Sequence, residues 1–302
     1  FIALGNGNRA NLSTAGTAWG SDPYPITQRP WVDIAEGPFS DTSHTVIAIS
    51  SDSVELAVSS TDGTTWSNVS SGLGTGLKHI RYGNGKWICV KEDGTAYESI
   101  DNGTTWTSRT SETTKNINNV FYGNSKFFAV GDNGTIVQSS DGISWINWTS
   151  NCGANDNESL WDIAHGNGTW VTVGDNGSIY TSDESSCTFR TSGTTVDFNE
   201  LYYGNSTFVA LGDNGTILSS TDGITWTKRI SGTTDRLYSG IYRNSNFVAV
   251  GVNGTLLTAP DATSSATWSS NRTYTQDAYS CLLYTSDAAD ERSSVDLGGR
   301  RI

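Results

Sequence analysis

Residues 208–226, FVALGDNGTILSSTDGITW, contain two runs of alternating apolar residues with an Asp-Asn-Gly turn between them and a Ser-Thr-Asp-Gly-Ile-Thr-Trp turn at the end. Asn-Gly is a strong signal for a tight hairpin, because both residues tolerate a positive φ. The chain begins with a related stretch, residues 1–19, which aligns with the first without a gap. A pattern that restarts in this way predicts a repeat protein.

An aromatic residue closes each copy of the pattern. These residues are Trp19, Trp66, Trp106, Trp145, Phe189, Trp226 and Trp268. The last six are 40, 39, 44, 37 and 42 positions apart. A period of about 40 residues that holds four short strands is typical of propeller blades. The sequence therefore predicts an all-β fold, a seven-bladed β-propeller of four-stranded antiparallel blades.

The first unit lacks its first strand, and residues 277–280 stand where a further unit would begin. One interpretation is a closed ring in which this C-terminal strand completes the first blade. The alternative is a longer array that is cut at both ends.

The turn at residues 99–106, SIDNGTTW, has the full pattern Ser-x-Asp-x-Gly-x-Thr-Trp, and shorter forms occur at residues 60–66, 139–145 and 220–226. It resembles the Asp-box repeats of bacterial neuraminidases, which also occur in photosystem II assembly-factor propellers, sortilin-type receptors and some glycoside hydrolases. The resemblance covers nearly all of residues 1–280, and in regularity the repeats are most similar to the assembly-factor propellers.

We expect the acids and tryptophans that recur in these turns to have a structural role. Short polar side chains bond to the turn backbone, and the tryptophan buries a large area against the neighbouring blade. The residues concerned are Asp62, Trp66, Asp101, Trp106, Asp141, Trp145, Asp222 and Trp226.

The composition excludes several classes of partner. Only 16% of the residues are charged, and 31 Asp and Glu against 18 Lys and Arg give a net charge of −13. Nucleic acids and anionic membrane surfaces need a basic face, so we expect neither as a partner. No apolar run approaches the roughly 18–20 residues of a membrane-spanning helix.

Both ends of the chain look artificial. The sequence has no Met, so we expect an N-terminal truncation. Residues 281–291, CLLYTSDAADE, and 295–302, VDLGGRRI, resemble the in-frame translation of sequencing adapters. The predicted organisation is a propeller over residues 1–280 and a non-native, disordered tail over 281–302.

Candidate ligand-binding residues come from the predicted innermost strand of each unit. We aligned these strands on their terminal Gly, or on Asn244 in the last unit. One position of the aligned strands is then consistently aliphatic, and the position directly before it is mostly polar. That position holds Asp33, His79, Asn119, Asp162, Glu200 and Gly240. These side chains either satisfy the backbone where a loop enters a strand or form a shared site at the mouth of the central channel.

The predicted function is non-catalytic: an interaction module that binds a glycan or a protein through the channel mouth and the loops at residues 110–116, 151–159, 191–197 and 231–236. One alternative is a sialidase-like glycoside hydrolase that uses Asp33, Asp162 and Glu200, since hydrolysis needs two carboxylates at a suitable separation. The other is a chaperone similar to photosystem assembly factors. We expect no catalytic residue, cofactor or metal site.

We further expect a monomer, or one part of a multidomain chain, in an extracellular, cell-surface or periplasmic protein. Cys89 replaces a small core residue, whereas Cys152 and Cys187 lie in atypical segments of adjacent units. Whether these two cysteines pair is open, because a disulfide needs Cα atoms within roughly 7 Å.

Overall fold

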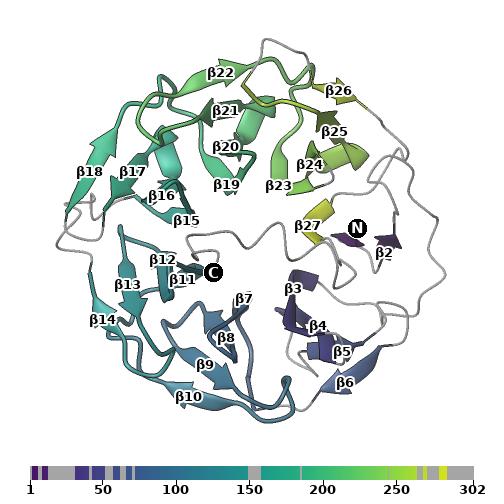
Figure 1. Cartoon of the computed structure of the whole chain (residues 1–302), viewed down its shortest axis with the longest axis vertical. Helices are drawn as coiled ribbons and strands as arrows, with labels where there is room; N and C mark the ends of the chain where they lie inside the picture. Colours follow the sequence, from purple (N-terminus) through teal and green to yellow (C-terminus); the bar gives the residue numbers. More distant parts are fainter. Residues whose placement is uncertain are drawn as a thin grey trace, which may run out of the picture.

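Short strands separated by turns account for almost all of the regular structure (Figure 1). The computed structural model describes residues 2–5, 9–12, 31–40, 43–51, 57–61, 66–69, 72–148, 158–183, 186–243, 245–263, 268–270 and 279–283. Within these ranges the only helical segments are three-residue 3₁₀ turns: η2 (Asp175–Gly177), η3 (Asp213–Gly215) and η4 (Val252–Gly254). No helix in the described part of the chain has the length and hydropathy to span a membrane.

Six antiparallel sheets have four strands each and follow the chain from the innermost strand outward. The first three are β3 (Trp31–Ser40), β4 (Ser43–Ser50), β5 (Ala57–Ser60) and β6 (Ser67–Val69); β7 (Leu77–Gly83), β8 (Lys86–Lys91), β9 (Ala96–Ser99) and β10 (Thr107–Arg109); and β11 (Ile117–Gly123), β12 (Lys126–Gly131), β13 (Ile136–Ser139) and β14 (Ile146–Asn147). The other three are β15 (Leu160–Gly166), β16 (Thr169–Gly174), β17 (Ile179–Ser182) and β18 (Cys187–Arg190); β19 (Phe198–Gly204), β20 (Thr207–Gly212), β21 (Ile217–Ser220) and β22 (Thr227–Arg229); and β23 (Leu237–Arg243), β24 (Asn246–Gly251), β25 (Leu256–Ala259) and β26 (Ser269–Ser270).

A seventh sheet joins the two ends of the described chain. It has the order β2 (Arg9–Leu12), β1 (Ile2–Gly5) and β27 (Tyr279–Leu283). The innermost strands β3, β7, β11, β15, β19, β23 and β27 contact one another in this order, and β27 also contacts β3, so the ring is closed (Figure 1). The predicted all-β propeller of antiparallel blades is thus confirmed. The fourth strand expected for the seventh sheet would come from residues 13–30, which lie outside the described residues.

Strand β27 differs from the expectation for the C-terminal tail. Residues 281–283, the start of the segment expected to be disordered, pair with Ile2–Leu4 of β1. An unpaired edge of β1 would expose a row of backbone N–H and C=O groups, and any extended segment can satisfy them. The adapter origin of residues 281–302 stays a prediction, and residues 284–302 lie outside the described part of the chain.

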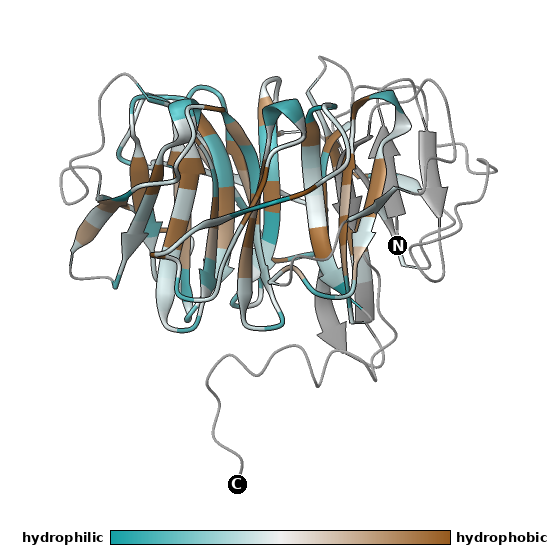
Figure 2. Ribbon diagram, turned by 90° about the horizontal axis from the view of Figure 1, so that it is seen from above, coloured by the Kyte–Doolittle hydropathy of each residue, from teal (hydrophilic) through white to brown (hydrophobic). Residues whose placement is uncertain are grey.

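The core lies between neighbouring blades. In one cluster, Ile88 and Val90 of β8 pack against Val120 and Phe127 of the next blade, and Trp145 closes the cluster. In the side view of Figure 2 the hydrophobic residues lie mainly along the strands, and many of the turns are hydrophilic. Each blade is thus stabilised by burial against its neighbours, at about 25 cal/mol per Å² of apolar surface.

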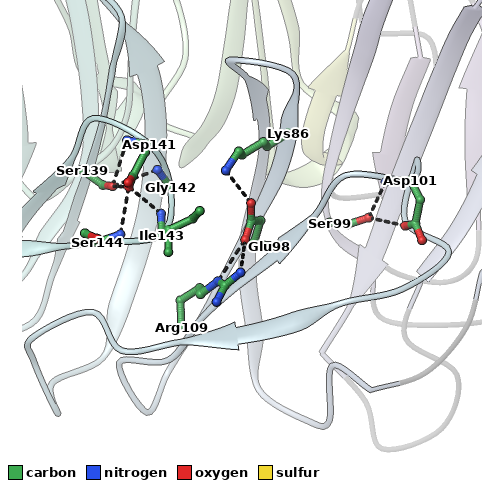
Figure 3. Close-up of polar contacts among 10 residues, drawn as sticks. All are labelled: Lys86, Glu98, Ser99, Asp101, Arg109, Ser139, Asp141, Gly142, Ile143 and Ser144. Carbon is green, nitrogen blue, oxygen red and sulfur yellow. Dashed lines mark hydrogen bonds and ion pairs between the residues drawn. The ribbon is translucent and has the colours of Figure 1, made fainter.

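The Ser-Asp turns between the third and fourth strands use their polar groups locally. Asp141 Oδ1 accepts the backbone N–H groups of Ile143 and Ser144, both at 2.8 Å, and Ser139 Oγ accepts that of Gly142 at 2.8 Å (Figure 3). The turns at Asp101 and Asp222 have the same Ser and Asp contacts. These contacts support the structural interpretation of the turn acids. Asp62 lies outside the described residues.

The tryptophans that close these turns pack at the blade interfaces. Trp106 and Trp226 donate their Nε1–H to the carbonyl of Gly103 and Gly223, both at 2.9 Å. Trp145 is buried, while Trp66 is half-buried.

A buried ion cluster distinguishes the blade of β7–β10. Glu98 on β9 is 5% exposed and lies between two cations (Figure 3). Lys86 Nζ is 2.6 Å from its Oε1, and the Arg109 guanidinium bonds to Oε2 at 2.6 and 2.9 Å. Burial raises the pKa of the Glu98 carboxyl, but hydrogen bonds from Lys86 and Arg109 outweigh it and lower this pKa overall.

The cysteines divide into two kinds. Cys89 is buried and is a free thiol, and burial raises its pKa. Cys187 is disulfide-bonded, whereas Cys152 lies outside the described residues. Pairing of Cys187 with Cys152 therefore stays a prediction.

Candidate functional site

Each innermost strand of the four-stranded sheets begins with a β-bulge. Its pairing with the second strand skips one residue, for example between Leu160 and Asp162 in β15. A bulge re-aims the side chains beside it and strengthens the local twist. The residues directly after the bulges, which we call the ring position, are Asp33, His79, Asn119, Asp162, Glu200 and Ser239.

The sequence alignment was wrong by one residue in β23. Ser239 pairs with Val250 as Glu200 pairs with Leu211, so Ser239 and not Gly240 occupies the ring position. Arg243, paired with Asn246, takes the place of the terminal Gly. Cross-strand register, in which Arg243 pairs with Asn246, decided this position.

Ring-position side chains bond to the backbone of the next blade. Asp33 Oδ2 accepts the N–H of Ile80 at 2.8 Å, and Asp162 Oδ2 accepts that of Leu201 at 2.6 Å. Glu200 likewise accepts a bond from the Gly240 backbone. In each case the donor directly follows the ring position of the next strand. The carboxylates thus link neighbouring blades, as the structural interpretation of these residues requires.

His79 takes part in the same pattern as a neutral imidazole. Its Nε2 is 3.2 Å from Asp33 Oδ2, and its Nδ1 lies 3.5 Å from the N–H of Val120. Burial lowers the pKa of His79 to about 4, and Arg81 adds to this, against the opposing effect of Asp33. The contact with Asp33 is therefore a hydrogen bond from a neutral N–H and not an ion pair.

Asn119 is the exception in the ring. The N–H of Ile163, which Asn119 would be expected to bind, donates instead to Asp162 Oδ1 at 2.7 Å. Asn119 is 5% exposed, and its Oδ1 has no hydrogen-bond partner among the described residues. Buried polar atoms without a partner are rare and costly, so the junction between β11 and β15 carries an unused acceptor.

The carboxyl groups of Asp162 and Glu200 resist ionisation. Burial raises the pKa of Asp162 to about 7, despite its two backbone hydrogen bonds. Burial and the charges of Asp162 and Asp33 raise the pKa of Glu200 well above its usual value, and Arg81 opposes this. Side chains from β3, β7, β15 and β19 therefore share one electrostatic environment around the axis.

Two further side chains of the innermost strands carry one buried polar atom that has no hydrogen-bond partner among the described residues. The Arg81 guanidinium lies 5.5 Å from the centre of the Phe121 ring, and its buried Nε has no hydrogen-bond acceptor among the described residues. Tyr202 is 9% exposed, and its hydroxyl also has no partner within the described chain. Its ring fills the space where a Cβ on Gly240 would lie.

Above the ring is the end of the propeller that we call the loop face. It consists of the turns between second and third strands and the connections from each outermost strand to the next innermost strand. In four of the six four-stranded blades the residue inside the bulge pairs with a turn acid of its own blade. The pairs are Lys78–Glu92 at 3.4 Å, Asn118–Asp132 at 3.1 Å, Trp161–Asp175 at 2.5 Å and Asn199–Asp213 at 3.0 Å.

Trp161 is the exposed member of this set that sequence reasoning missed. It is 38% exposed and is the only exposed tryptophan of the described residues. Its Nε1–H is held by Asp175, while its neighbour Asp162 faces the blade interface. The signal was available in the alignment, because the equivalent positions hold Val32, Lys78, Asn118, Asn199 and Tyr238.

The connections of the loop face are fixed by repeated local bonds. Ser192 Oγ lies 3.1 Å from the carbonyl oxygen of Thr194, and Ser231 and Thr233 repeat this contact. The carbonyl oxygen of Thr194 also packs against Gly177 of the preceding turn so closely that a Cβ there would lie 2.1 Å away. These two connections of the loop face are therefore held by local contacts.

No group of His, Cys, Asp and Glu within the described ranges is arranged to hold a metal ion. Of the acidic loop at residues 155–158 only Glu158 is described, and it accepts a hydrogen bond from the Tyr180 hydroxyl at 3.2 Å.

No protein-family model matches this chain, and no curated protein does. Several solved structures are similar to it. A YCF48 propeller bound to a D1 peptide is 13% identical, with 83% of this chain and 86% of that chain covered and a TM-score of 0.62. YCF48 from Cyanidioschyzon merolae is 16% identical over 80% and 84%, with a TM-score of 0.61. The computationally designed Ika8 protein is 10% identical over 86% and 92%, with a TM-score of 0.60. At these identities the likeness shows the fold.

Proposed function

We propose that this propeller is a non-catalytic interaction module that binds a protein segment on its loop face. The observation that carries the proposal is Trp161, which is exposed on this face and held in place by Asp175. Large aromatic residues held rigidly at the centre of a surface dominate the binding energy of protein interfaces. Trp161 directly precedes the ring-position residue Asp162 on the innermost strand β15.

A preformed surface lowers the entropic cost of binding. The bonds of Ser192 and Ser231 and the close packing of Gly177 against Thr194 give the connections before β19 and β23 defined local contacts. The likeness to YCF48 bound to a D1 peptide supports a peptide as ligand, because a propeller of similar fold binds one. That likeness also favours, as second candidate, a chaperone similar to photosystem assembly factors.

The contacts of the ring carboxylates argue for a non-catalytic role. A hydrolase needs one carboxyl group as acid and a second as base or nucleophile, both open to the substrate. Asp33 and Asp162 are 5% and 4% exposed, and their oxygens accept backbone N–H groups of the next blade. We also propose an extracellular, cell-surface or periplasmic location, from the low charge and the richness in Ser, Thr and Asn.

Selection of a random peptide-display library on the purified propeller tests this function. We expect enriched peptides to bind the wild type and the control variant Phe189→Ala equally, and to lose at least about tenfold in affinity to Trp161→Ala. Phe189 is a matched control, because it is an exposed aromatic residue (54%) on the outermost strand β18.

Peptides that bind Trp161→Ala as tightly as the wild type would overturn the loop-face assignment. A propeller that selects no peptide but binds glycans on an array would replace the protein ligand with a carbohydrate.

A further inference from the structure

We propose that Asn84 and Asn167 are sites of spontaneous covalent modification, at which the side-chain amide is lost as ammonia and an acidic residue remains. Each of them precedes a glycine in the turn between the first and second strands of its blade, β7–β8 and β15–β16. Because successive strands run in opposite directions, these turns lie at the end of the propeller opposite the loop face. The inference therefore does not depend on the proposed function.

The chemistry of an Asn-Gly pair needs only the chain and water. The backbone nitrogen of the glycine loses its proton and forms a bond to the side-chain carbonyl carbon of the asparagine, and the side-chain nitrogen leaves with a proton as ammonia. Water then opens the cyclic imide at one of its two carbonyl groups. The product is either Asp or isoaspartate, in which the main chain runs through the side-chain carbon atoms. Glycine permits the attack because it has no Cβ to obstruct it.

Seven Asn-Gly pairs lie in the described residues, and their backbones are alike. All seven asparagines have a φ between +48° and +57°. Besides the two proposed sites, the pairs begin at Asn102, Asn133, Asn176, Asn214 and Asn253. The local conformation therefore does not distinguish the pairs, and the surroundings of the glycine must do so.

The glycine is buried in the other five pairs, at Gly103, Gly134, Gly177, Gly215 and Gly254. The N–H of Gly103 donates to Ser99 Oγ at 2.9 Å. That of Gly134 donates to the carbonyl oxygen of Glu158 at 2.7 Å. The attack requires the glycine nitrogen to leave such contacts and approach the side-chain carbon, so the fold holds these pairs in an unreactive arrangement.

Gly85 and Gly168 lack these restraints. Both glycines and the asparagines before them are exposed. Apart from the chain neighbours, no described heavy atom lies within 4 Å of the place that a Cβ on either glycine would take. Neither N–H donates to a backbone carbonyl of the described residues. The glycine nitrogen is therefore open to solvent and can turn towards the asparagine side chain without losing a contact.

The chain itself offers a matched control, because two other blades have the same turn with a different second residue. The turns of β11–β12 and β19–β20 contain Asn124-Ser125 and Asn205-Ser206, and the serines have φ values of +59° and +57°. Serine thus fits this position of the turn, whereas its side chain obstructs the attack on the preceding residue. Gly168→Ser should therefore keep the turn and remove its reactivity.

Modification would change the turn as well as its charge. Isoaspartate adds an atom to the backbone of a two-residue turn whose flanking residues are paired, Gly83 with Lys86 and Gly166 with Thr169. The register of a hairpin depends on the length of its turn. We therefore expect isoaspartate at position 84 or 167 to speed amide hydrogen exchange in the residues beside the turn.

Peptide mapping by mass spectrometry tests the proposal on the purified protein, after incubation at pH 8 in buffer and in urea. In buffer we expect Asn84 and Asn167 to lose ammonia at least about tenfold faster than the other five pairs, because those must first break their contacts. In urea all seven pairs should react at similar rates. Methyl transfer from labelled S-adenosylmethionine by an isoaspartate-specific methyltransferase distinguishes isoaspartate from Asp.

Gly168→Ser should slow the reaction at Asn167 at least about tenfold and leave the reaction at Asn84 unchanged. Its melting temperature shows whether the variant is folded. Equal rates at the seven pairs in the folded wild type, or a faster reaction at a pair whose glycine is buried, would overturn the inference. A folded Gly168→Ser protein that reacts at Asn167 as fast as the wild type would overturn it as well.

Discussion

The carboxyl group of Asp162 in β15 accepts the backbone N–H of Leu201 in β19, with 2.6 Å between Oδ2 and the nitrogen. The two residues are 39 positions apart, and they belong to different blades. Its other oxygen accepts the N–H of Ile163 at 2.7 Å. One buried side chain therefore satisfies a donor in its own strand and a donor in the next blade, which ties adjacent repeats together at the axis.

Replacing Asp162 with Ala should lower the free energy of unfolding by about 2–4 kcal/mol, because two buried N–H groups lose their acceptor. Chemical denaturation at pH 6 checks this value. Asp162→Asn keeps one carbonyl oxygen and should cost less. A loss below about 0.5 kcal/mol for Ala would show that water replaces the carboxylate.

The same residue makes stability depend on pH. Its pKa is raised by burial from 3.8 to about 7 in the folded protein, so its contribution is fully present below about pH 4 and is lost as the pH rises towards 7. The stability difference between the wild type and Asp162→Asn should therefore shift against the wild type by about 2–4 kcal/mol between pH 4 and 7. A difference that is constant with pH would contradict the raised pKa.

The stability contributed by the Ser-Asp turns should depend on pH in the opposite direction to that of Asp162. The backbone N–H of Ser144 and then that of Ile143 lower the pKa of Asp141, so its contribution exists above about pH 4 and is lost as the pH falls through the lowered pKa. Asp141→Ala should cost about 1 kcal/mol at pH 7 and progressively less in acid. Thermal unfolding at pH 7 and pH 3 measures both values. Equal costs at the two pH values would mean that the charge of Asp141 is irrelevant to the turn.

The Glu98 cluster can be compared with blades that lack it. In β17 and β21 the equivalent residues are Thr181 and Ser219, whose hydroxyls accept from Arg190 and Arg229 at 2.8 and 2.7 Å. Glu98→Thr should cost about 3 kcal/mol, because Lys86 is left without its partner. Adding Lys86→Thr, which reproduces the residue at the equivalent position 169, should recover part of this loss. A double-mutant cycle by urea denaturation gives the coupling energy, and additive effects would show that the ion pair contributes nothing.

Replacing either of two glycines near the loop face with Ala should lower the stability by very different amounts. A Cβ on Gly212 would lie 2.4 Å from the carbonyl oxygen of Asp197, whereas a Cβ on Gly193 meets nothing within 4 Å. Gly212→Ala should therefore cost about 3 kcal/mol through a backbone clash. Gly193→Ala should cost about 1 kcal/mol, because Gly193 has a φ of +75°. Similar melting temperatures for both variants would show that the connection before β19 can move aside.

The sequence by itself determined the structural features that depend only on residues close together in the chain. The Asn-Gly hairpins, the Ser-Asp turns around Asp101, Asp141 and Asp222, and the alternating strands depend on contacts between near neighbours, so their pattern predicted the repeat and the propeller. The five candidate ring residues were also found, because an innermost strand recurs at a fixed place in each unit.

Tertiary structure alone decided what those residues contact. Cross-strand register put Ser239, and not Gly240, in the ring. Blade packing paired Asp162 with Leu201 and left the Oδ1 atom of Asn119 without a hydrogen-bond partner among the described residues. Trp161 and Asp175 meet because a bulge turns one side chain towards a hairpin 14 positions away. Such contacts depend on how whole blades are placed against one another. Because neighbouring repeats have similar local patterns but different side chains at their interfaces, no local pattern in the sequence specifies them.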